Sequence, residues 1–340
     1  MSHREAVGEA LVTLLSPPVG WILAFVWGAL WGSFFNVAIH RLAREDARLR
    51  DLLAPPSHCP ACTTPIRAFD NVPILAWLWL RGRCRACKAP ISIRYPLVEL
   101  AGALAGMAVY YLVVLEHPDA PPLMVARFLL YFYFVGTLLV LALIDLDTML
   151  LPEAITLPAI PFFFVTALLL HDVERWDLVI GLAVGFGGLK ALEVGYRAAT
   201  GRDGLGGGDS MLMAIVGGFL GWRALPFTLG LGATVGTLVT LPLLVIQRRR
   251  ARRDAASQQA NAAAQHGDVA AQHGDIAAQQ GDGAAQQVDR AAQQGTGDDD
   301  DDSIRHVEVP FGPFLVVGAL AYLFLHQWAW AWLTGLADRP

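Results

Sequence analysis

Residues 123–144 read LMVARFLLYFYFVGTLLVLALI, and Arg127 is the one charged residue in this stretch. A helix needs about 20 mostly apolar residues to cross the hydrocarbon core of a bilayer, so this stretch predicts a membrane span. Comparable runs lie at about 18–38, 97–115, 154–170, 177–196, 225–246 and 312–334. A shorter, glycine-rich run at about 211–222 is either a short span or half of a broken one. With it, the sequence predicts an all-α polytopic membrane protein of about eight transmembrane helices.

The composition supports this class. Of the 340 residues 55% are hydrophobic and 16% are charged, and the mean hydropathy is +0.45. A soluble globule could not cover that much apolar surface with so few charges. The net charge of -5 comes from the run Asp298–Asp302, and the rest of the chain is close to neutral. A nucleic-acid-binding protein would show a basic face, so we expect the lipid bilayer as a partner and no nucleic acid.

The loops between the apolar runs differ in charge. Arginines follow the first run, lie in the loop around 197–209 and form RRRARR at 248–253, whereas the loops 116–122 and 171–177 are net acidic. Because Lys and Arg mark the cytoplasmic ends of spans, we expect the basic loops to be cytoplasmic and both termini to face outward. The first span lacks a clear cleavage signal and is expected to be retained.

Four cysteines form two CxxC pairs, Cys59 with Cys62 and Cys84 with Cys87, with 21 residues between the pairs. Four thiolates can close a tetrahedral zinc site, and each CxxC turn supplies two of the ligands. The segment lies on the expected cytoplasmic side, where thiols stay reduced, which favours structural zinc over disulfides. A redox pair and the absence of any site are the alternatives.

Residues 254–303 contain five near-copies of a seven-residue unit that begins as AAQHGDV, followed by five Asp. The unit lacks apolar a and d positions and mostly contains Gly, which disfavours a coiled coil. We interpret the segment as a disordered insert. The predicted organisation is a first transmembrane span (1–39), a cytoplasmic four-cysteine domain (40–96), a transmembrane core (97–246), a disordered low-complexity insert (247–308) and a last transmembrane span (309–340).

Carboxylates occur at the ends of two predicted spans. Asp145 and Asp147 end the third, and Asp209 begins the sixth, directly after glycines that include Gly206 and Gly208. Two spans lie between these positions and return the chain to the same face, so Asp145 and Asp209 are both expected near the cytoplasmic surface. Carboxylates at membrane depth are expensive and mark functional sites. Two that lie within hydrogen-bond reach share a proton, and one of them can activate a water for peptide hydrolysis.

Other roles for these carboxylates stay open on the residues alone. Asp209 can cap the helix that it begins, because Asp is a favoured capping residue. Intramembrane carboxylates also serve in ion or proton transport, and Lys190 with Glu193 would be the membrane-depth pair that a transporter needs. Their spacing of one turn, however, predicts a mutual ion pair.

The chain also contains an ordered set of motifs. They are GSFFNV (32–37) with Arg41-Leu42, CPAC (59–62), DNVPILAWL (70–78), LRGRCRACKAPISIRYPLVEL (80–100), IDLDTMLLPEAITLP (144–158), GGGD (206–209) and VPFGPF (309–314). This set resembles the bacterial type IV prepilin peptidases, GxGD aspartic proteases that are both prepilin leader peptidases and N-methyltransferases. The likeness covers nearly the whole chain apart from residues 254–303.

The resemblance implies a membrane aspartic protease whose catalytic pair is Asp145 and Asp209, with Asp147, Gly206 and Gly208 in support. The transmembrane core 97–246 is then the peptidase. The implied substrates are type IV prepilins and type II secretion pseudopilins, cleaved at the cytoplasmic face of the bacterial inner membrane.

The resemblance also implies that the new N-terminal residue is methylated with S-adenosylmethionine, in association with the cysteine domain. By resemblance alone, Asn36, Arg41 and Glu99 are the candidates for binding this cofactor. Many relatives have Lys two residues after the GxGD aspartate, where this chain has Met211. The alternative functions are an ion-coupled transporter that uses the same carboxylates and a peptidase that lacks methyltransferase activity.

Overall fold

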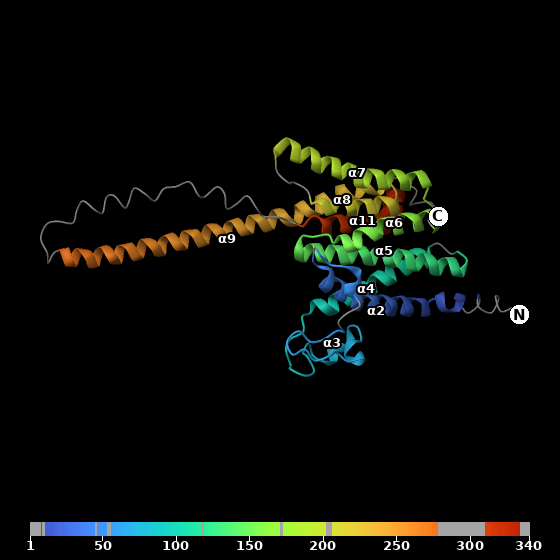
Figure 1. Cartoon of the computed structure of the whole chain (residues 1–340), viewed down its shortest axis with the longest axis horizontal. Coiled ribbons are helices and arrows are strands. Elements are labelled where there is room, and N and C mark those ends of the chain that lie inside the picture. Colours follow the sequence, from blue (N-terminus) through green and yellow to red (C-terminus); the bar gives the residue numbers. More distant parts are fainter. Residues whose placement is uncertain are drawn as a thin grey trace. The chain divides into compact units, whose positions relative to one another are not determined.

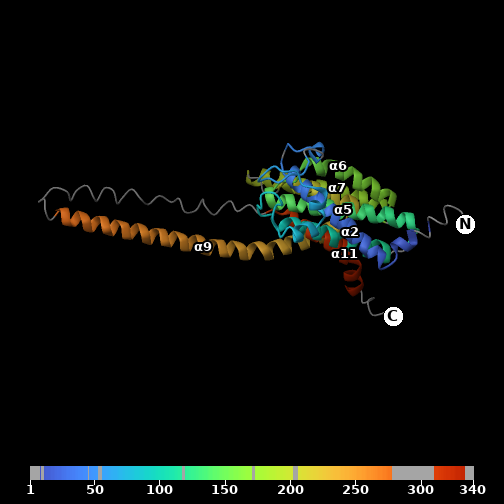
Figure 2. The same cartoon turned by 90° about the horizontal axis from the view of Figure 1, so that it is seen from below.

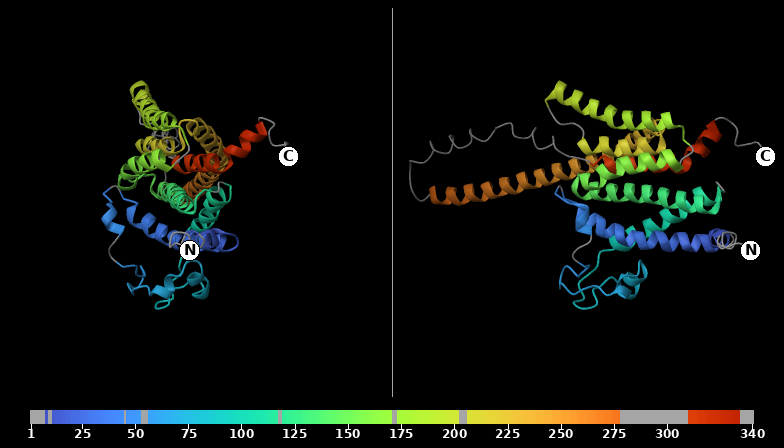
Figure 3. Two further views of the ribbon diagram at one scale, coloured as in Figure 1. Left: turned by 90° about the vertical axis from the view of Figure 1, so that its right-hand side faces the viewer. Right: turned by 45° about the vertical axis from the view of Figure 1, so that its right-hand side comes forward.

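The computed structural model describes residue 8 and residues 11–44, 46–52, 56–116, 119–170, 173–201, 206–277 and 310–333. These residues are mostly helical, as Figures 1, 2 and 3 show from different sides. The elements are α2 (Val19–Leu42), η1 (Leu49–Leu52), η2 (Ala68–Asn71), α3 (Leu75–Trp79), α4 (Arg94–Tyr110), η3 (Tyr111–Leu115), α5 (Pro121–Thr148), α6 (Glu153–Leu170), α7 (Arg175–Thr200), α8 (Gly207–Leu220), α9 (Ala224–Ala277) and α11 (Gly312–Leu333). The chain divides into two compact units, one of Met1–Thr234 with Pro310–Pro340 and one of Val235–Val309.

Six helices among the described residues are long and apolar enough to cross a bilayer, which confirms a multi-pass helical membrane protein. They are Val19–Leu42, Arg94–Leu115, Pro121–Thr148, Glu153–Leu170, Arg175–Thr200 and Ala224–Gln258. Each coincides with a predicted span. The two other predicted spans correspond to α8, which has 14 residues, and to α11, whose part Gly312–His326 is apolar and which continues to Leu333. The described residues thus supply six full-length spans and two further apolar helices.

The second unit differs from its prediction in part. Helix α9 continues through residues 247–277, the first part of the segment that composition predicts to be disordered. Ala, Gln and Arg dominate that stretch and have high helix propensity, which is the physical reason for a helix there. Residues 278–309, which include the five-Asp run, lie outside the described residues.

Within the first unit, glycines allow helices to approach closely. A Cβ atom at Gly28 of α2 would clash with the carbonyl oxygen of Gly102 in α4. Gly181 of α7 and Gly217 of α8 face each other in the same way. Within a membrane the hydrophobic effect does not drive helices together, so close van der Waals packing stabilises their contacts. Small residues allow such packing because the two backbones can touch. Helix α2 is thereby held against α4, and α8 against α7.

Aromatic rings join the helices that bear the two candidate aspartates. Phe134 of α5 stacks on Phe219 of α8 with 4.2 Å between ring centroids, and Phe163 of α6 packs edge-on against both rings. All three side chains are fully buried. This cluster fixes α5 and α8 relative to each other because buried aromatic pairs prefer defined geometries.

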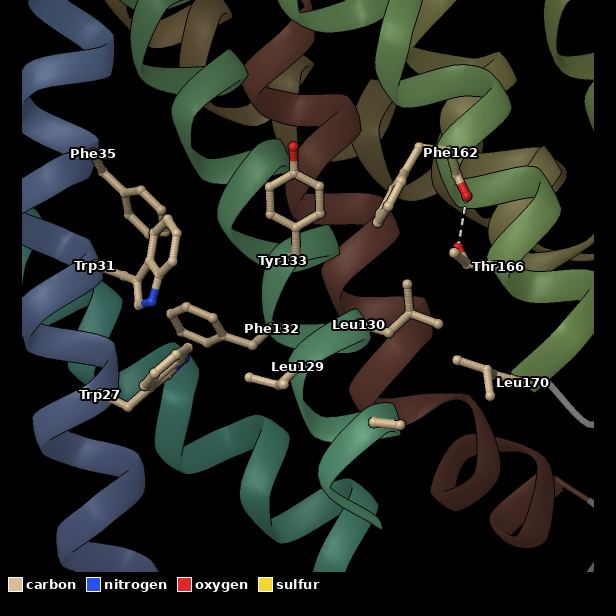
Figure 4. A pocket seen from close by; sticks show the side chains of 11 residues that line it. Trp27, Trp31, Phe35, Leu129, Leu130, Phe132, Tyr133, Phe162, Thr166 and Leu170 are labelled. Atoms are coloured by element: carbon tan, nitrogen blue, oxygen red, sulfur yellow. Dashed lines mark hydrogen bonds between the residues drawn. The ribbon is translucent and has the colours of Figure 1, made fainter. Parts of the chain in front are cut away.

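A cavity of about 460 Å³ opens between α2, α5 and α6 (Figure 4). Its lining is apolar and largely aromatic: Trp27, Trp31, Phe35, Ala126, Leu129, Leu130, Phe132, Tyr133, Phe162, Thr166 and Leu170. Its residues on α5 precede Asp145 by 12 to 19 positions, or roughly 18–29 Å at about 1.5 Å per residue. The cavity therefore lies away from the candidate aspartates.

Candidate functional site

Asp145 lies in the last turn of α5, where its side chain is 5% exposed. The helix ends at Met149, which adopts a left-handed conformation (φ 54°) and donates its N–H to the Asp145 carbonyl at 2.8 Å. Such a left-handed residue closes a helix by satisfying one of its last free carbonyls. The backbone at Asp145 is thus fixed on both sides by helical hydrogen bonds.

Asp209 lies in the first turn of α8 and is 7% exposed. Its N–H bonds to the carbonyl of Gly206, the residue that precedes the helix, at 3.0 Å. A Cβ atom at Gly208 would approach the Cβ of Leu151 to 2.6 Å, so the start of α8 packs directly on the loop that follows α5. Gly208 therefore has a steric role, since it lets α8 begin beside the end of α5.

The two predicted catalytic aspartates are brought together. Asp209 begins α8 beside the end of α5 that holds Asp145, because Gly208 packs on Leu151 in the loop that follows α5. Asp145 Oδ2 also accepts a hydrogen bond from the N–H of Gly312 at 3.0 Å, and Gly312 is the first residue of α11. Unpaired N–H groups and the helix dipole make a helix N-terminus favourable for a carboxylate. Each aspartate therefore sits at the N-terminus of an apolar helix, Asp145 at that of α11 and Asp209 at that of α8.

Asp147 forms an ion pair with Arg94 and is not part of the pair of Asp145 and Asp209. Arg94, the first residue of α4, donates to Asp147 Oδ1 at 2.8 Å and lies 2.7 Å from Oδ2. It also donates to the carbonyl of Leu143 at 3.3 Å. A planar guanidinium suits such a two-oxygen contact, and a cation near a helix C-terminus is favourable. Arg94 thus fastens the start of α4 to the turn that contains Asp145.

The predicted ion pair between Lys190 and Glu193 is confirmed, with Lys190 Nζ 2.9 and 3.0 Å from the two carboxylate oxygens. The pair lies near the GxGD segment, because a Cβ atom at Gly207 would be 3.9 Å from Lys190 Nζ. At position 211 the methionine sulfur accepts a hydrogen bond from the buried Thr156 hydroxyl at 3.3 Å. Met211 therefore fills the space beside α6 with an uncharged side chain.

The four cysteines converge in the segment between α2 and α4. Their Sγ atoms all lie within 4.8 Å of one another, and those of Cys59 and Cys87 are 3.8 Å apart. A tetrahedral centre with Zn–S bonds of about 2.3 Å places its sulfurs about 3.8 Å apart. The donor set and its spacing therefore fit a four-coordinate metal ion such as zinc.

The two halves of this cluster are structurally alike. In the first half, the backbone carbonyl of Cys59 accepts a hydrogen bond from the N–H of Thr63 at 2.8 Å. In the second half, the carbonyl of Cys84 accepts one from the N–H of Lys88 at 3.1 Å. Thr63 and Lys88 both have positive φ, 57° and 62°. A short antiparallel bridge closes each turn, His58 with Pro65 in one and Arg83 with Pro90 in the other. The chain thus contains two copies of one turn, each with two cysteines that could bind a metal.

Cys62 shows how such a turn prepares a thiol for metal binding. The Thr64 hydroxyl lies 3.3 Å from its Sγ. This side-chain hydrogen bond, with that of the Thr64 backbone, lowers the pKa of Cys62 to about 6. The thiolate is the form that binds metal, so this shift favours metal binding at Cys62. At the equivalent position of the second turn, the hydrogen bond of the Ala89 backbone lowers the pKa of Cys87, but the neighbouring thiols oppose it and raise that pKa to about 11.

Asn36, Arg41 and Glu99 occupy the boundary between the helices and the cysteine segment. Each one hydrogen-bonds a backbone group of this chain. Asn36 donates to the Tyr95 carbonyl at 3.0 Å, and Arg41 donates to two carbonyls of η1 at 3.1 and 3.2 Å. Glu99 accepts the N–H of Ile74 at 2.6 Å. These contacts join α2 and α4 to the loops, which is a structural use of all three side chains.

Reasoning from sequence missed two groups next to the aspartates, the Gly312 N–H and Arg94. Both lie in motifs of the family resemblance, Gly312 in VPFGPF at 309–314 and Arg94 in ISIRYP at 91–96. Nothing in those motifs shows which helix end they approach, because the contacts span 167 and 53 residues of sequence.

The aspartate pair can act on a peptide bond, since two neighbouring carboxyl groups can share one proton and polarise a water. Comparisons with known proteins support that chemistry. Residues 26–113 match the bacterial peptidase A24 N-terminal domain, and residues 132–241 match the type IV leader peptidase family. No solved structure matches the chain.

Several curated relatives carry the name prepilin leader peptidase/N-methyltransferase. The relative from Aeromonas hydrophila is 39% identical over 261 residues, which is 70% of this chain and 87% of the relative. The one from Klebsiella pneumoniae is 42% identical over 60% of this chain and 87% of its own length. The one from Stutzerimonas stutzeri is 36% identical over 69% of this chain and 85% of its own length. The chain belongs to the type IV leader peptidase family.

Proposed function

We propose that this chain is a prepilin peptidase and N-methyltransferase, which removes the leader of type IV prepilins and methylates the new N-terminal residue. The observation that carries the proposal is the meeting of Asp145 and Asp209 at the N-termini of α11 and α8, in a chain whose relatives bear that name. The loops beside both aspartates belong to the basic side of the protein, which supports a site at the cytoplasmic face of the inner membrane.

In the proposed reaction, Asp145 and Asp209 share one proton and hold a water between them. The ionised carboxylate takes a proton from the water as its oxygen attacks the scissile carbonyl, and the other carboxyl protonates the substrate. The Gly312 N–H holds Asp145 Oδ2, which orients that carboxyl toward its partner. The ion pair of Arg94 with Asp147 steadies the last turn of α5.

We further propose about eight membrane crossings, with α8 and α11 as two of them and α8 as a short one. Both begin at the aspartates, so each would enter the membrane at the active site. The domain limits predicted from sequence, a cytoplasmic cysteine domain at 40–96 and a peptidase core at 97–246, belong to this proposal. Pseudopilins of type II secretion are included as substrates because of the family resemblance.

Two cofactors belong to the proposal as well. Cys59, Cys62, Cys84 and Cys87 would hold Zn²⁺ in a filled site, where the metal stabilises the fold and has no open position for catalysis. S-adenosylmethionine is proposed as methyl donor from the relatives' name. Asn36, Arg41 and Glu99 fit a donor site less well, because their polar atoms already bond the chain's own backbone.

The test is incubation of the purified full-length chain with a prepilin, with and without S-adenosylmethionine. Mass spectrometry should show loss of the leader in both reactions and one added methyl group only with the donor. Asp145→Asn and Asp209→Asn should each lower cleavage at least about 100-fold. As a control, Asp177→Asn changes a mostly buried carboxylate near the start of α7, away from the aspartate pair, and should cleave normally. Full cleavage by both active-site variants would overturn the assignment.

A further inference from the structure

Helix α3 has an exposed apolar face, at whose edge the Trp79 side chain hydrogen-bonds Asp70. Leu75, Leu78 and Trp79 occupy positions i, i+3 and i+4 of this helix, and they are 54%, 57% and 48% exposed. The other side of α3 is packed, since Ala76 is buried and Trp77 donates to the Ile91 carbonyl at 3.0 Å. A short helix that is anchored on one side and apolar on the other resembles the arrangement of an interfacial helix.

The position of α3 along the membrane span can be derived from one hydrogen bond. The N–H of Ile74, at the start of α3, donates to Glu99 Oε2 at 2.6 Å. Glu99 is five residues into α4, or about 7 Å along the helix. Leu97 and Leu104 of α4 are each 54% exposed and face the surroundings of the span. Helix α3 therefore lies beside the first turns of a membrane helix (Figures 1 and 3).

A cationic cavity follows α3 directly. It has a volume of about 540 Å³ and is lined by Trp79, Leu80, Arg81, Arg83, Cys84, Arg85 and Lys88. Arg85 is neutralised by Asp70, which lies 2.6 Å away. The exposed side chains of Arg81, Arg83 and Lys88 form no ion pair with any residue that the structure describes. The cavity thus offers three positive charges to an anion.

We propose that α3 is a membrane-interface anchor that binds anionic phospholipid. Leu75, Leu78 and Trp79 enter the interfacial layer of the leaflet, and Arg81, Arg83 and Lys88 bind the phosphate groups of its lipids. A lipid is the occupant because the charges border an apolar face at the level of a membrane span. Trp is enriched at this depth of bilayers, and basic side chains there are attracted by anionic headgroups. The proposal goes beyond the proposed function, since it concerns how the cysteine segment is held on the membrane.

The test uses the full-length chain in liposomes of phosphatidylcholine and phosphatidylglycerol, with bromine on the acyl chains of one lipid at a time. The contribution of Trp79 to the fluorescence is obtained by subtracting the tryptophan emission of the Trp79→Phe variant from that of the wild type. Brominated phosphatidylglycerol should quench this difference about twofold more than brominated phosphatidylcholine at the same mole fraction. If neither lipid quenches it, α3 lies in water and the proposal fails. Equal quenching by both lipids would overturn the anionic site.

Charge variants then locate the site. The triple variant Arg81→Gln, Arg83→Gln, Lys88→Gln should lose the preference for brominated phosphatidylglycerol. The matched control is Arg248→Gln, Arg249→Gln, Arg250→Gln, which removes three charges from another basic run and should keep it. Loss of the preference in both variants would attribute it to net charge and overturn the site. The metal content of each variant reports whether its cysteine segment is folded. If a variant does not fold, the comparison of the two lipids in the wild type still tests the proposal.

Discussion

Substitution of Gly312 by alanine is the sharpest test of the aspartate site, because it adds a single carbon atom at a known place. A Cβ atom there would lie 2.7 Å from Asp145 Oδ2 and 3.2 Å from its Cγ. An ordinary contact is about 3.4 Å or longer, so the carboxyl or the start of α11 must move by roughly 0.7 Å. Asp145 is buried and cannot turn away freely.

The expected loss of activity follows from two effects. A displacement approaching 1 Å at a reacting group can cost about 100-fold in rate. Weakening a hydrogen bond to a charged group removes about 1.5–3 kcal/mol, which corresponds to roughly 10–150-fold. We therefore expect kcat for leader cleavage to fall about 10–100-fold, with little change in KM, since the N–H acts on the aspartate and not on the substrate.

The assay is leader cleavage by purified variants, followed by mass spectrometry at several prepilin concentrations. Gly318→Ala is the steric control on the same helix, because its Cβ atom would clash with the Thr228 backbone and not with Asp145. It should lower the thermal unfolding midpoint while the folded fraction keeps its kcat. A folded Gly312→Ala enzyme with unchanged kcat, or an equal loss of kcat in both variants, would refute the reasoning.

Three further predictions concern other contacts. Arg94→Gln should lower kcat about 3–10-fold and cost only about 0.2–1 kcal/mol of stability, because its half-exposed ion pair with Asp147 positions a helix end; an unchanged rate would contradict this role. In the folded, metal-free protein the hydrogen bonds of Thr64 lower the pKa of Cys62 to about 6, so its thiol should react as a thiolate above that pH. Thr64→Val should raise the pH of half-maximal alkylation of Cys62, measured by mass spectrometry of the metal-free protein, and an unchanged pH would count against the hydrogen bond. Gly28→Ala should destabilise the α2–α4 contact by about 1–3 kcal/mol through overpacking, seen as a lower thermal midpoint in detergent; an unaltered midpoint would show that the helices do not touch there.

Much of the fold follows from local pattern. The long apolar runs match six helices because a bilayer demands helical hydrogen bonding over about 20 residues, whatever the neighbouring helices are. The short run at 211–222 was ambiguous for the same reason, since its length does not reach that requirement. Helix α8 in fact begins at Gly207, before the apolar run, so that its first turn contains Asp209. The helical stretch at 247–277 was not expected, because repeats with Gly and polar residues are typical of disorder.

The site divides in a similar way. The spacing of the CxxC pairs predicted a cluster of four sulfurs, since each pair is a local turn, and the structure places all four within 4.8 Å. Counting spans predicted that Asp145 and Asp209 would share a face. Counting could not show that Asp145 meets Gly312 or that Arg94 meets Asp147, because these contacts depend on which helix ends pack together.

By itself, the sequence determined that this is a helical membrane protein, and it predicted two cysteine turns that could hold a metal and two carboxylates on one side. These are consequences of hydrophobic length, cysteine spacing and the parity of membrane crossings, which are properties of short segments. Only the tertiary structure decided that α8 and α11 begin at the aspartates and that Arg94 holds the turn beside them. Those arrangements arise from glycine-mediated contacts and a shared aromatic core between helices far apart in the chain, where the packing energy belongs to no single segment.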